Sequence, residues 1–249
     1  MLVSIITVCL NARNTISHAI ESVAHQSYPH VEHIVVDGGS TDGTVELVRE
    51  VEGKVVKLIS EPDEGIYDAM NKGLALAEGD VVGFLNADDV YFDEKVVETV
   101  VAEMEKRNVD SCYGDLVYVN SDLSKVVRYW RSSPYRPGSF KKGWHPPHPT
   151  FFVKRWVYER YGGFDTRFEI SADFELMLRF LEKFKISSVY LPKPLVKMRV
   201  GGTSNRSVSN IIKGNINCYK AFKKNGLDVS VLYPFYRLLP KIWQFLARD

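Results

Sequence analysis

One stretch of the sequence decides the fold: Val81-Val82-Gly83-Phe84-Leu85-Asn86-Ala87-Asp88-Asp89. It is an apolar run of strand length that ends in two adjacent acids. We interpret it as a buried strand that delivers Asp88 and Asp89 to the carboxyl edge of an open α/β sheet, where such sheets bind ligands. Neighbouring carboxylates repel each other unless a positive charge lies nearby. Mg²⁺ or Mn²⁺ carrying phosphate oxygens would supply that charge; the alternative is that the pair caps a helix beginning near Asp93.

The residues before this stretch alternate between strand-like and helix-like patterns. Leu2–Val8 is a continuous β-branched run, typical of a parallel strand that is covered on both faces, and a helix capped by Asn14 follows it. Further strands are expected at Val31–Val36 and Val55–Ile59, with a short helix after Gly43 and a longer one at Ile66–Ala77. This alternation predicts βαβ units, a parallel sheet and right-handed crossovers.

After Asp89 the regular alternation of strand-like and helix-like segments ends. A helix near Asp93–Lys106 leads to two strands that should pair, Ser111–Val119 and Lys125–Trp130. Residues 132–149 are rich in Pro, Gly, aromatic and cationic residues, and long loops of this kind are usually functional or mobile. The remaining predicted elements are helices at Arg155–Tyr161, Ser171–Phe184 and Val208–Lys224 and strands at Ile186–Leu191 and Val196–Val200.

Composition narrows the class of protein. A chain of 249 residues suits one large domain, and a net charge of +1 gives no reason to expect nucleic acid as a partner. The three cysteines are odd in number and lack metal-ligand spacing, which favours a reducing compartment and hence the cytoplasm. We expect no secretion signal, because a basic n-region and a cleavage site are missing, and no membrane-spanning helix.

The C-terminal part of the chain is basic. From Asn205 onward, eight Lys and Arg residues stand against two Asp. Residues 229–247 mix aromatic and aliphatic side chains with cations, which suits a helix lying on a membrane surface. We therefore expect the tail, residues 226–249, to attach the protein peripherally to the cytoplasmic face of a membrane. Packing on the body of the protein, or against a second copy, explains the pattern equally well.

Three turns that carry acids follow strands in the first ninety residues. Asp37 ends the second strand, Asp63 follows the third, and Asp88 and Asp89 end the fourth. Because the carboxyl ends of parallel strands meet at one edge of a sheet, we expect these side chains to lie close together. A single aspartate in a turn usually binds local amides. Several at one edge favour a nucleotide site.

Five segments of the chain form an ordered series over about residues 3–180: Val3–Asn11, Val35–Thr44, Ala69–Asp80, Asn86–Asp89, and Gly162–Asp165 with Ala172–Leu176. In this order they resemble the motifs of family-2 glycosyltransferases. Four positions depart from the usual pattern of that family, which often has a second acid, an aromatic residue, an Arg and a Glu where this chain has Gly38, Leu10, Met70 and Ala172.

The resemblance implies a GT-A fold, an α/β architecture with a Rossmann-like, mostly parallel central sheet flanked by helices. It implies one domain over residues 1–225, with a nucleotide-sugar-binding half at 1–90 and an acceptor-side half at 91–225, before a basic helical tail. It also implies inverting, non-processive transfer of one sugar from a nucleotide-diphosphate sugar, assisted by Mg²⁺ or Mn²⁺. A glycan or lipid-linked oligosaccharide is the expected acceptor.

The resemblance also assigns roles to individual residues. It places Asp37 near the nucleobase, Asp88 near the ribose, and Asp89 on the metal ion that bridges the diphosphate. Asp173 is the expected base that deprotonates the acceptor hydroxyl. The residues expected to contact the donor are Val8, Asn11, Asp37, Asp63, Asn71, Asp88 and His148.

These roles fit the chemistry of the reaction. A bound cation stabilises the charge that develops on a nucleoside diphosphate leaving group. Inversion needs one base on the opposite face of the sugar, and such groups typically contribute about 10²–10⁴-fold in rate. Taken alone, Asp173 would also be explained as a first-turn acid that the helix dipole favours.

Two other classes of protein compete with this interpretation. A non-catalytic nucleotide-sugar or glycan-binding module would be expected to have lost an acid at position 89 or 173, and both remain. A sugar nucleotidyltransferase usually has a Gly-rich, Arg-containing loop after its first strand, where this chain has Leu10–Asn14. A nicotinamide oxidoreductase is excluded by the missing Gly-x-Gly-x-x-Gly turn.

Overall fold

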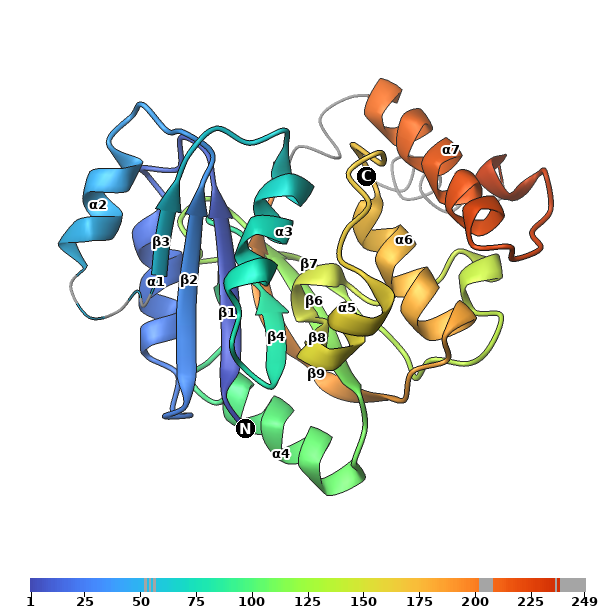
Figure 1. Ribbon diagram of the computed structural model, residues 1–249, viewed down its shortest axis with the longest axis horizontal. Coiled ribbons are helices and arrows are strands. Elements are labelled where there is room, and N and C mark those ends of the chain that lie inside the picture. Colours follow the sequence, from blue (N-terminus) through green and yellow to red (C-terminus); the bar gives the residue numbers. More distant parts are fainter. Residues whose placement is uncertain (52, 54, 56, 202–207, 236, 238–249) are drawn as a thin grey trace.

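The computed structural model describes residues 1–249 apart from 52, 54, 56, 202–207, 236 and 238–249. The described residues form one sheet of nine strands, shown in Figure 1. Across the sheet the strands are β3 (Lys57–Ser60), β2 (Val31–Asp37), β1 (Val3–Cys9), β4 (Val81–Phe84), β8 (Phe152–Lys154), β6 (Ser111–Val119), β9 (Ser188–Arg199) and β5 (Asp89–Tyr91), and β7 (Val126–Trp130) pairs with β6. Strands β1, β2, β3, β4, β6 and β9 run in one direction, so the expected mostly parallel sheet is confirmed.

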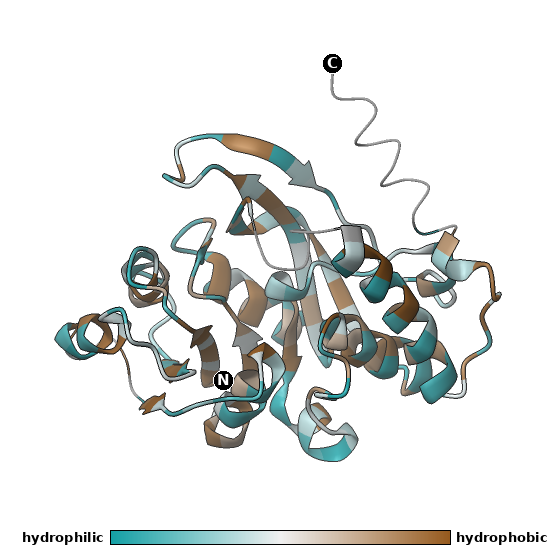
Figure 2. Ribbon diagram, turned by 90° about the horizontal axis from the view of Figure 1, so that it is seen from above, coloured by the Kyte–Doolittle hydropathy of each residue, from teal (hydrophilic) through white to brown (hydrophobic). Residues whose placement is uncertain are grey.

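Helices cover both faces of the sheet; hydrophobic residues dominate its strands, and hydrophilic residues are frequent on the outer helices and loops (Figure 2). On one face lie α1 (Ile16–Ala24), α2 (Thr44–Glu50) and α4 (Val96–Arg107). On the other lie α3 (Ile66–Leu76), α5 (Arg155–Tyr161), α6 (Ala172–Leu178) and α7 (Val208–Lys224). The first helix buries the apolar face that the sequence predicts: Ile16, Ala19, Ile20 and Val23.

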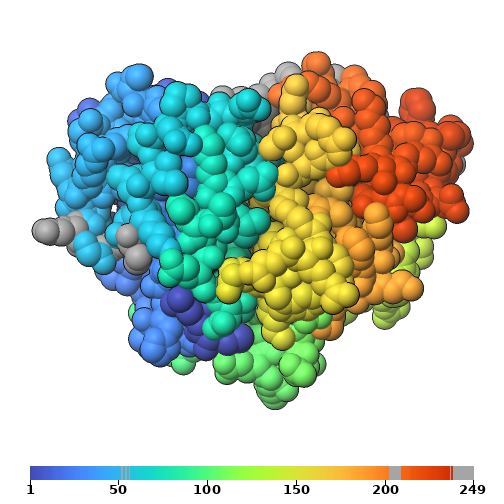
Figure 3. All heavy atoms as spheres, viewed as in Figure 1, coloured from blue at the N-terminus to red at the C-terminus, as the bar shows by residue number. Residues whose placement is uncertain are grey.

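Helix α3 lies very close to the sheet because a glycine faces β1. A Cβ atom on Gly73 would stand 2.4 Å from Cγ2 of Ile6. The visible face of the molecule shows α3 and the segment around residues 160–170 in direct contact along the middle (Figure 3). Helix α3 therefore joins the first part of the chain to the last.

The structure differs from the prediction where short strands form. Strand β4 ends at Phe84, and Asp89 belongs to β5, which pairs antiparallel with β9. The two strands predicted at Ile186–Leu191 and Val196–Val200 are one strand, β9, whose register against β6 shifts near Gly114. Strand β8 was not predicted, because three residues of strand are too short for a periodic pattern. The helix predicted at Ser171–Phe184 is α6 followed by a π-helical turn, η3 (Arg179–Lys183).

The described part of the tail packs on the body of the protein. Tyr233 is 2% exposed and its ring lies 5.1 Å from that of Phe222 in α7, while the Arg237 guanidinium lies 4.6 Å from the Phe174 ring centroid. Residues 238–249, which carry the rest of the predicted surface helix, lie outside the described residues. In the described ranges there is no helix with the length and hydrophobicity needed to cross a bilayer.

Candidate active site

Asp37 organises the turn after β2. Its carboxylate is 0% exposed, and Oδ2 accepts hydrogen bonds from the N–H groups of Gly39 (3.0 Å) and Ser40 (2.9 Å) and from the Ser60 hydroxyl (2.8 Å). Burial raises the pKa of Asp37, but these hydrogen bonds outweigh it and hold the pKa below its usual value. Asp37 therefore holds the turn in shape, and its contact with the nucleobase stays a prediction.

Asn11 ties the loop after β1 to the same turn. Its Oδ1 accepts a hydrogen bond from the N–H of Thr41 (3.0 Å), and its own N–H donates to the Ser40 hydroxyl (2.7 Å). The side chain is exposed, so Asn11 lies at the sheet edge where a donor was expected. Val8 differs, because its side chain packs in the core, and its contact with the donor stays a prediction.

Asp63 lies over the backbone of Gly38. A Cβ atom at position 38 would stand 2.2 Å from Oδ2 of Asp63, so the carboxylate occupies the space that a side chain there would need. Oδ1 accepts a hydrogen bond from the N–H of Gly65 (2.8 Å), whereas no donor to Oδ2 is recorded within the described ranges. The carboxylate is partly exposed. Asp63 therefore has a carboxylate oxygen without a hydrogen-bond partner among the described residues, and its contact with the donor stays a prediction.

Asp88 and Asp89 are placed differently, although they are neighbours. The Asp89 carboxylate is 0% exposed; Oδ2 lies 3.3 Å from Nδ2 of Asn86, and Oδ1 has no partner among the described residues. Burial first, and then the charge of Asp88, raises the pKa of Asp89 well above its usual value. Asp88 is partly exposed, and its carbonyl oxygen accepts a hydrogen bond of 2.6 Å from Arg199. The carboxylate that a ligand at the edge can reach is therefore that of Asp88.

The residues of this turn suit a hard cation only in part. Buried Oδ1 atoms of Asn86 and Asp89 lack partners within the described residues, and oxygen atoms of this kind are the ligands that Mg²⁺ and Mn²⁺ prefer. The described chain contains no group of three or more side chains that could hold a metal ion unaided. This fits a cation bound through one or two carboxylates and completed by substrate phosphates.

Asp173 lies in the first turn of α6, beside the N-terminal turn of α3. The Tyr67 hydroxyl donates a hydrogen bond of 3.0 Å to Oδ1 of Asp173, across 106 positions of sequence. Asp173 is partly exposed. Figure 1 shows the first turns of α3 and α6 on the side of the molecule to which the arrows of β1, β2 and β3 point. Asp173 thus shares the carboxyl edge with the acid-bearing turns.

His148 lies beneath the site. It is 8% exposed, and its ring is 5.6 Å from that of Phe84 and 5.5 Å from that of Phe164. Burial lowers the pKa of His148, and the nearby charge of Asp173 opposes this effect only in part. His148 is therefore a buried imidazole that is packed between the rings of Phe84 and Phe164.

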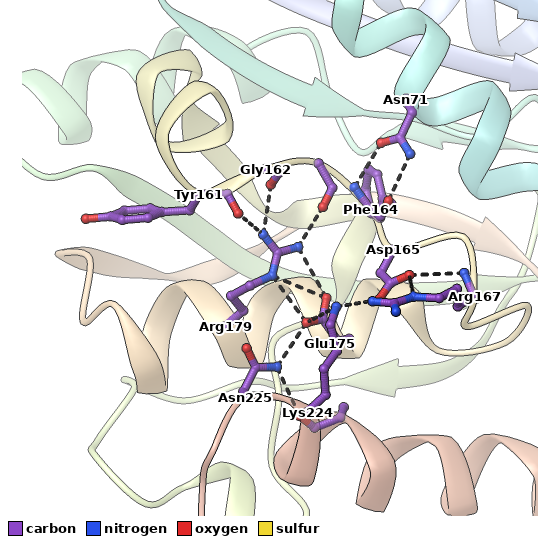
Figure 4. Close-up of polar contacts among 12 residues, drawn as sticks. Asn71, Tyr161, Gly162, Phe164, Asp165, Arg167, Glu175, Arg179, Lys224 and Asn225 are labelled. Carbon is purple, nitrogen blue, oxygen red and sulfur yellow. Dashed lines mark hydrogen bonds and ion pairs between the residues drawn. The ribbon is translucent and has the colours of Figure 1, made fainter.

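Asn71 has a structural role that the sequence did not predict. Its Nδ2 donates to the carbonyl oxygen of Phe164 (2.9 Å), and its Oδ1 accepts from the N–H of Phe164 (2.8 Å), as Figure 4 shows. A Cβ atom on Gly163 would stand 2.5 Å from that Oδ1, so glycine is needed there. Both ends of the Asn71 amide bind the backbone of Phe164, and a contact of Asn71 with the donor stays a prediction.

A buried ion pair holds α6 against the segment before it. Arg179 lies 3.2 Å from Glu175, which is 0% exposed, and Arg179 also donates to the carbonyl oxygens of Tyr161, Gly162 and Gly163 (Figure 4). Asn225 and Lys224, at the end of α7, donate to the same carboxylate. This network fixes the helix that carries Asp173.

Two residues were missed by sequence reasoning. Tyr67 lies two residues before the motif segment Ala69–Asp80, and nothing in the sequence indicates that its hydroxyl meets Asp173. Arg199 ends β9, and its contact with the Asp88 carbonyl depends on β9 returning beside β5. Neither the contact of Tyr67 with Asp173 nor that of Arg199 with Asp88 can be predicted from a local sequence pattern.

The comparisons with known proteins agree with this arrangement. The sequence model described as "Glycosyl transferase family 2" matches residues 4–162. "Uncharacterized glycosyltransferase Rv1514c" of Mycobacterium tuberculosis is 34% identical over 180 residues, which are 71% of this chain and 68% of the relative.

Two solved structures share the fold. Staphylococcus aureus TarS 1–349 in complex with UDP-GlcNAc superposes with a TM-score of 0.70 at 17% identity, over 100% of this chain and 74% of that one. The mannosyltransferase PcManGT from Pyrobaculum calidifontis, in complex with GDP-Man and Mn²⁺, has a TM-score of 0.65 at 22% identity, over 98% and 70%. The predicted GT-A fold is confirmed, and the chain belongs to glycosyl transferase family 2 and is a glycosyltransferase.

Proposed function

We propose that this glycosyltransferase transfers one sugar from a nucleoside-diphosphate sugar to a hydroxyl of a glycan or lipid-linked oligosaccharide, with inversion. The observation that carries the proposal is the position of Asp173, a partly exposed acid at the sheet edge, oriented by a hydrogen bond from Tyr67. Inversion requires a single base on the face of the sugar opposite the leaving group, and Asp173 would act as that base. Its free oxygen would accept the proton of the acceptor hydroxyl.

The donor would lie over the turns that follow β1, β2 and β3. Asp63 offers an oxygen without a partner in the described chain, and Asn11 offers an exposed amide. Each can bind polar groups of a nucleoside. Two proteins of the same fold were solved with UDP-GlcNAc and with GDP-Man, which supports a nucleotide-sugar donor without choosing the base.

The metal ion would bind at Asn86, Asp88 and Asp89, with Asp88 as the accessible carboxylate. We therefore propose Asp88 as the direct ligand and give Asp89 a supporting role below it, which reverses the order expected from the sequence. When bound, Mg²⁺ or Mn²⁺ would stabilise the negative charge of the departing diphosphate. Arg199, which holds the Asp88 carbonyl, would keep the turn in place.

The acceptor side of the proposal includes contact with a membrane. Val231, Leu232 and Phe235 in the described part of the tail are 70%, 49% and 66% exposed, next to a basic helix. Exposed apolar side chains beside cations suit the surface of an anionic bilayer. Co-sedimentation with anionic liposomes should detect the contact. Three cysteines that are buried and unpaired fit a cytoplasmic setting.

A thermal-shift screen tests the donor directly. UDP, GDP, dTDP and CMP are compared with and without Mn²⁺. A nucleotide present at about 100 times its dissociation constant stabilises the folded protein by about 2.7 kcal/mol. We expect a Mn²⁺-dependent shift with at least one nucleoside diphosphate, followed by sugar transfer from the matching donor. No shift with any nucleotide would contradict the proposal.

A further inference from the structure

Helix α3 makes two contacts with the opposite part of the site, from positions one helical turn apart. Tyr67 donates to Asp173, and its ring stacks on Phe164 at 5.6 Å with an interplanar angle of 25°. Asn71 binds both backbone groups of the same Phe164. Residues four apart lie on one face of a helix, so this face of α3 holds both the acid and the segment that leads to it.

The Tyr67 hydroxyl can only act as a donor to Asp173 at neutral pH. Burial, reinforced by the charge of Asp173, raises the pKa of Tyr67 well above its usual value. The phenol of Tyr67 therefore keeps its proton, and its O–H group donates a hydrogen bond to the carboxylate of Asp173. A hydrogen bond to an ionised group is shorter and stronger than one between neutral groups.

The bond holds one oxygen of the carboxylate, and the other has no hydrogen-bond partner among the described residues. Oδ1 of Asp173 is held by Tyr67, and the side chain remains partly exposed. The other end of α6 is held because Arg179 donates to the carbonyl oxygens of Tyr161, Gly162 and Gly163, in the segment before the helix. The rotamer of Asp173 is therefore set by its hydrogen bond to α3.

We propose that Tyr67 is a positioning residue, which orients Asp173 so that Oδ2 faces the acceptor hydroxyl. The inference rests on the proposed role of Asp173 as the base. Helix α3 begins at Ile66, three residues after Asp63, and the N–H of Gly65 just before it donates to Asp63. Because the same helix begins at the donor turn and holds the acid, it sets the distance between donor and base.

The test is the variant Tyr67→Phe, which removes the hydroxyl and keeps the ring on Phe164. We expect kcat to fall about 10- to 100-fold, because small misplacement of a reacting group costs about that much. The KM for the donor and the affinity for the free nucleotide should stay as in the wild type. If Tyr67 had only a structural role, Tyr67→Phe would lower the stability of the protein. It would not lower kcat while leaving the KM for the donor unchanged.

A double-mutant cycle with Asp173→Asn makes the test specific. If Tyr67 acts through Asp173, adding Tyr67→Phe to Asp173→Asn causes no further loss of turnover. Tyr28→Phe is the control, since it removes a tyrosine hydroxyl bonded to the Met1 carbonyl at the opposite edge of the sheet, and kcat should not change. Wild-type kcat in Tyr67→Phe, or a full additional loss in the double variant, would overturn the inference. Normal turnover in Asp173→Asn would instead refute the proposed role of Asp173 as the base.

Discussion

Oδ2 of Asp63 occupies the place of a side chain at Gly38, 2.2 Å from the position of a Cβ atom there. The two residues therefore depend on each other: because Gly38, in the turn after β2, has no side chain, the carboxylate of Asp63, from the loop before α3, can lie there. We therefore expect that the acid that contacts the donor at this position belongs to the loop before α3 and not to the turn after β2.

This relationship predicts the effect of two substitutions on nucleotide binding. Asp63→Ala should weaken the affinity for the nucleoside diphosphate about 10- to 100-fold, the value of a hydrogen bond to a charged group. Gly38→Ala should also weaken it, because the new Cβ displaces the carboxylate. In the double variant the loss should match that of Asp63→Ala alone, as measured by calorimetry. Wild-type affinity in Gly38→Ala would show that the position of Asp63 is irrelevant.

The metal-binding turn predicts different effects for its two acids. Asp88→Asn should lower the Mn²⁺-dependent affinity for nucleotide by about 100-fold or more, since it removes the accessible ligand. Asp89→Asn should cost nearer 10-fold, the effect of a residue that supports a ligand. Titration with Mn²⁺ at fixed nucleotide measures both. If Asp89→Asn abolished the dependence on Mn²⁺ while Asp88→Asn did not, the two roles would be the reverse.

Asn71 should contribute to stability and not to donor binding. Asn71→Ala leaves the N–H and carbonyl groups of Phe164 without their partners, and an unsatisfied buried group costs about 1–3 kcal/mol. Denaturant unfolding should show this loss, and the affinity for nucleotide should remain. If Asn71→Ala had normal stability but weakened nucleotide binding, the result would instead support the prediction that Asn71 contacts the donor.

His33 predicts a loss of stability in mild acid. It is buried, and burial lowers its pKa from 6.5 to about 4. Below about pH 6.5 the unfolded chain binds a proton at this residue that the folded protein does not, so the free energy of unfolding falls as the pH is lowered toward 4. The full effect is about 3 kcal/mol.

Chemical denaturation over this pH range checks the prediction. His33→Gln should show a smaller fall in stability than the wild type, while His18→Gln, at an exposed histidine, should follow the wild type. Equal slopes for wild type and His33→Gln would contradict it.

The sequence predicted the parts of this fold that depend on local pattern. The β-branched runs became β1 and β2, and the apolar face of α1 is buried as expected, because periodicity reports which side of an element meets the core. Strand β8 was not predicted because its pairing with β4 and β6 depends on tertiary contacts.

The candidate site was predicted less well, for a physical reason. The sequence indicates which acids follow strands, but not which of them the protein uses for its own turns. The Asp37 carboxylate accepts hydrogen bonds from backbone N–H groups of its own turn and the Asp89 side chain is buried, whereas Asp63 and Asp88 remain partly exposed. Exposure of a side chain at a sheet edge depends on neighbouring loops and has no local signature.

The central claim is that Asp173 removes the proton of the acceptor hydroxyl. The most direct test compares Asp173→Asn with the wild type in two measurements, the affinity for the donor nucleotide in Mn²⁺ and the turnover number for sugar transfer. We predict unchanged nucleotide affinity and a turnover lower by at least about 10²-fold, the usual contribution of a positioned base. Turnover within a few-fold of the wild type would contradict the account.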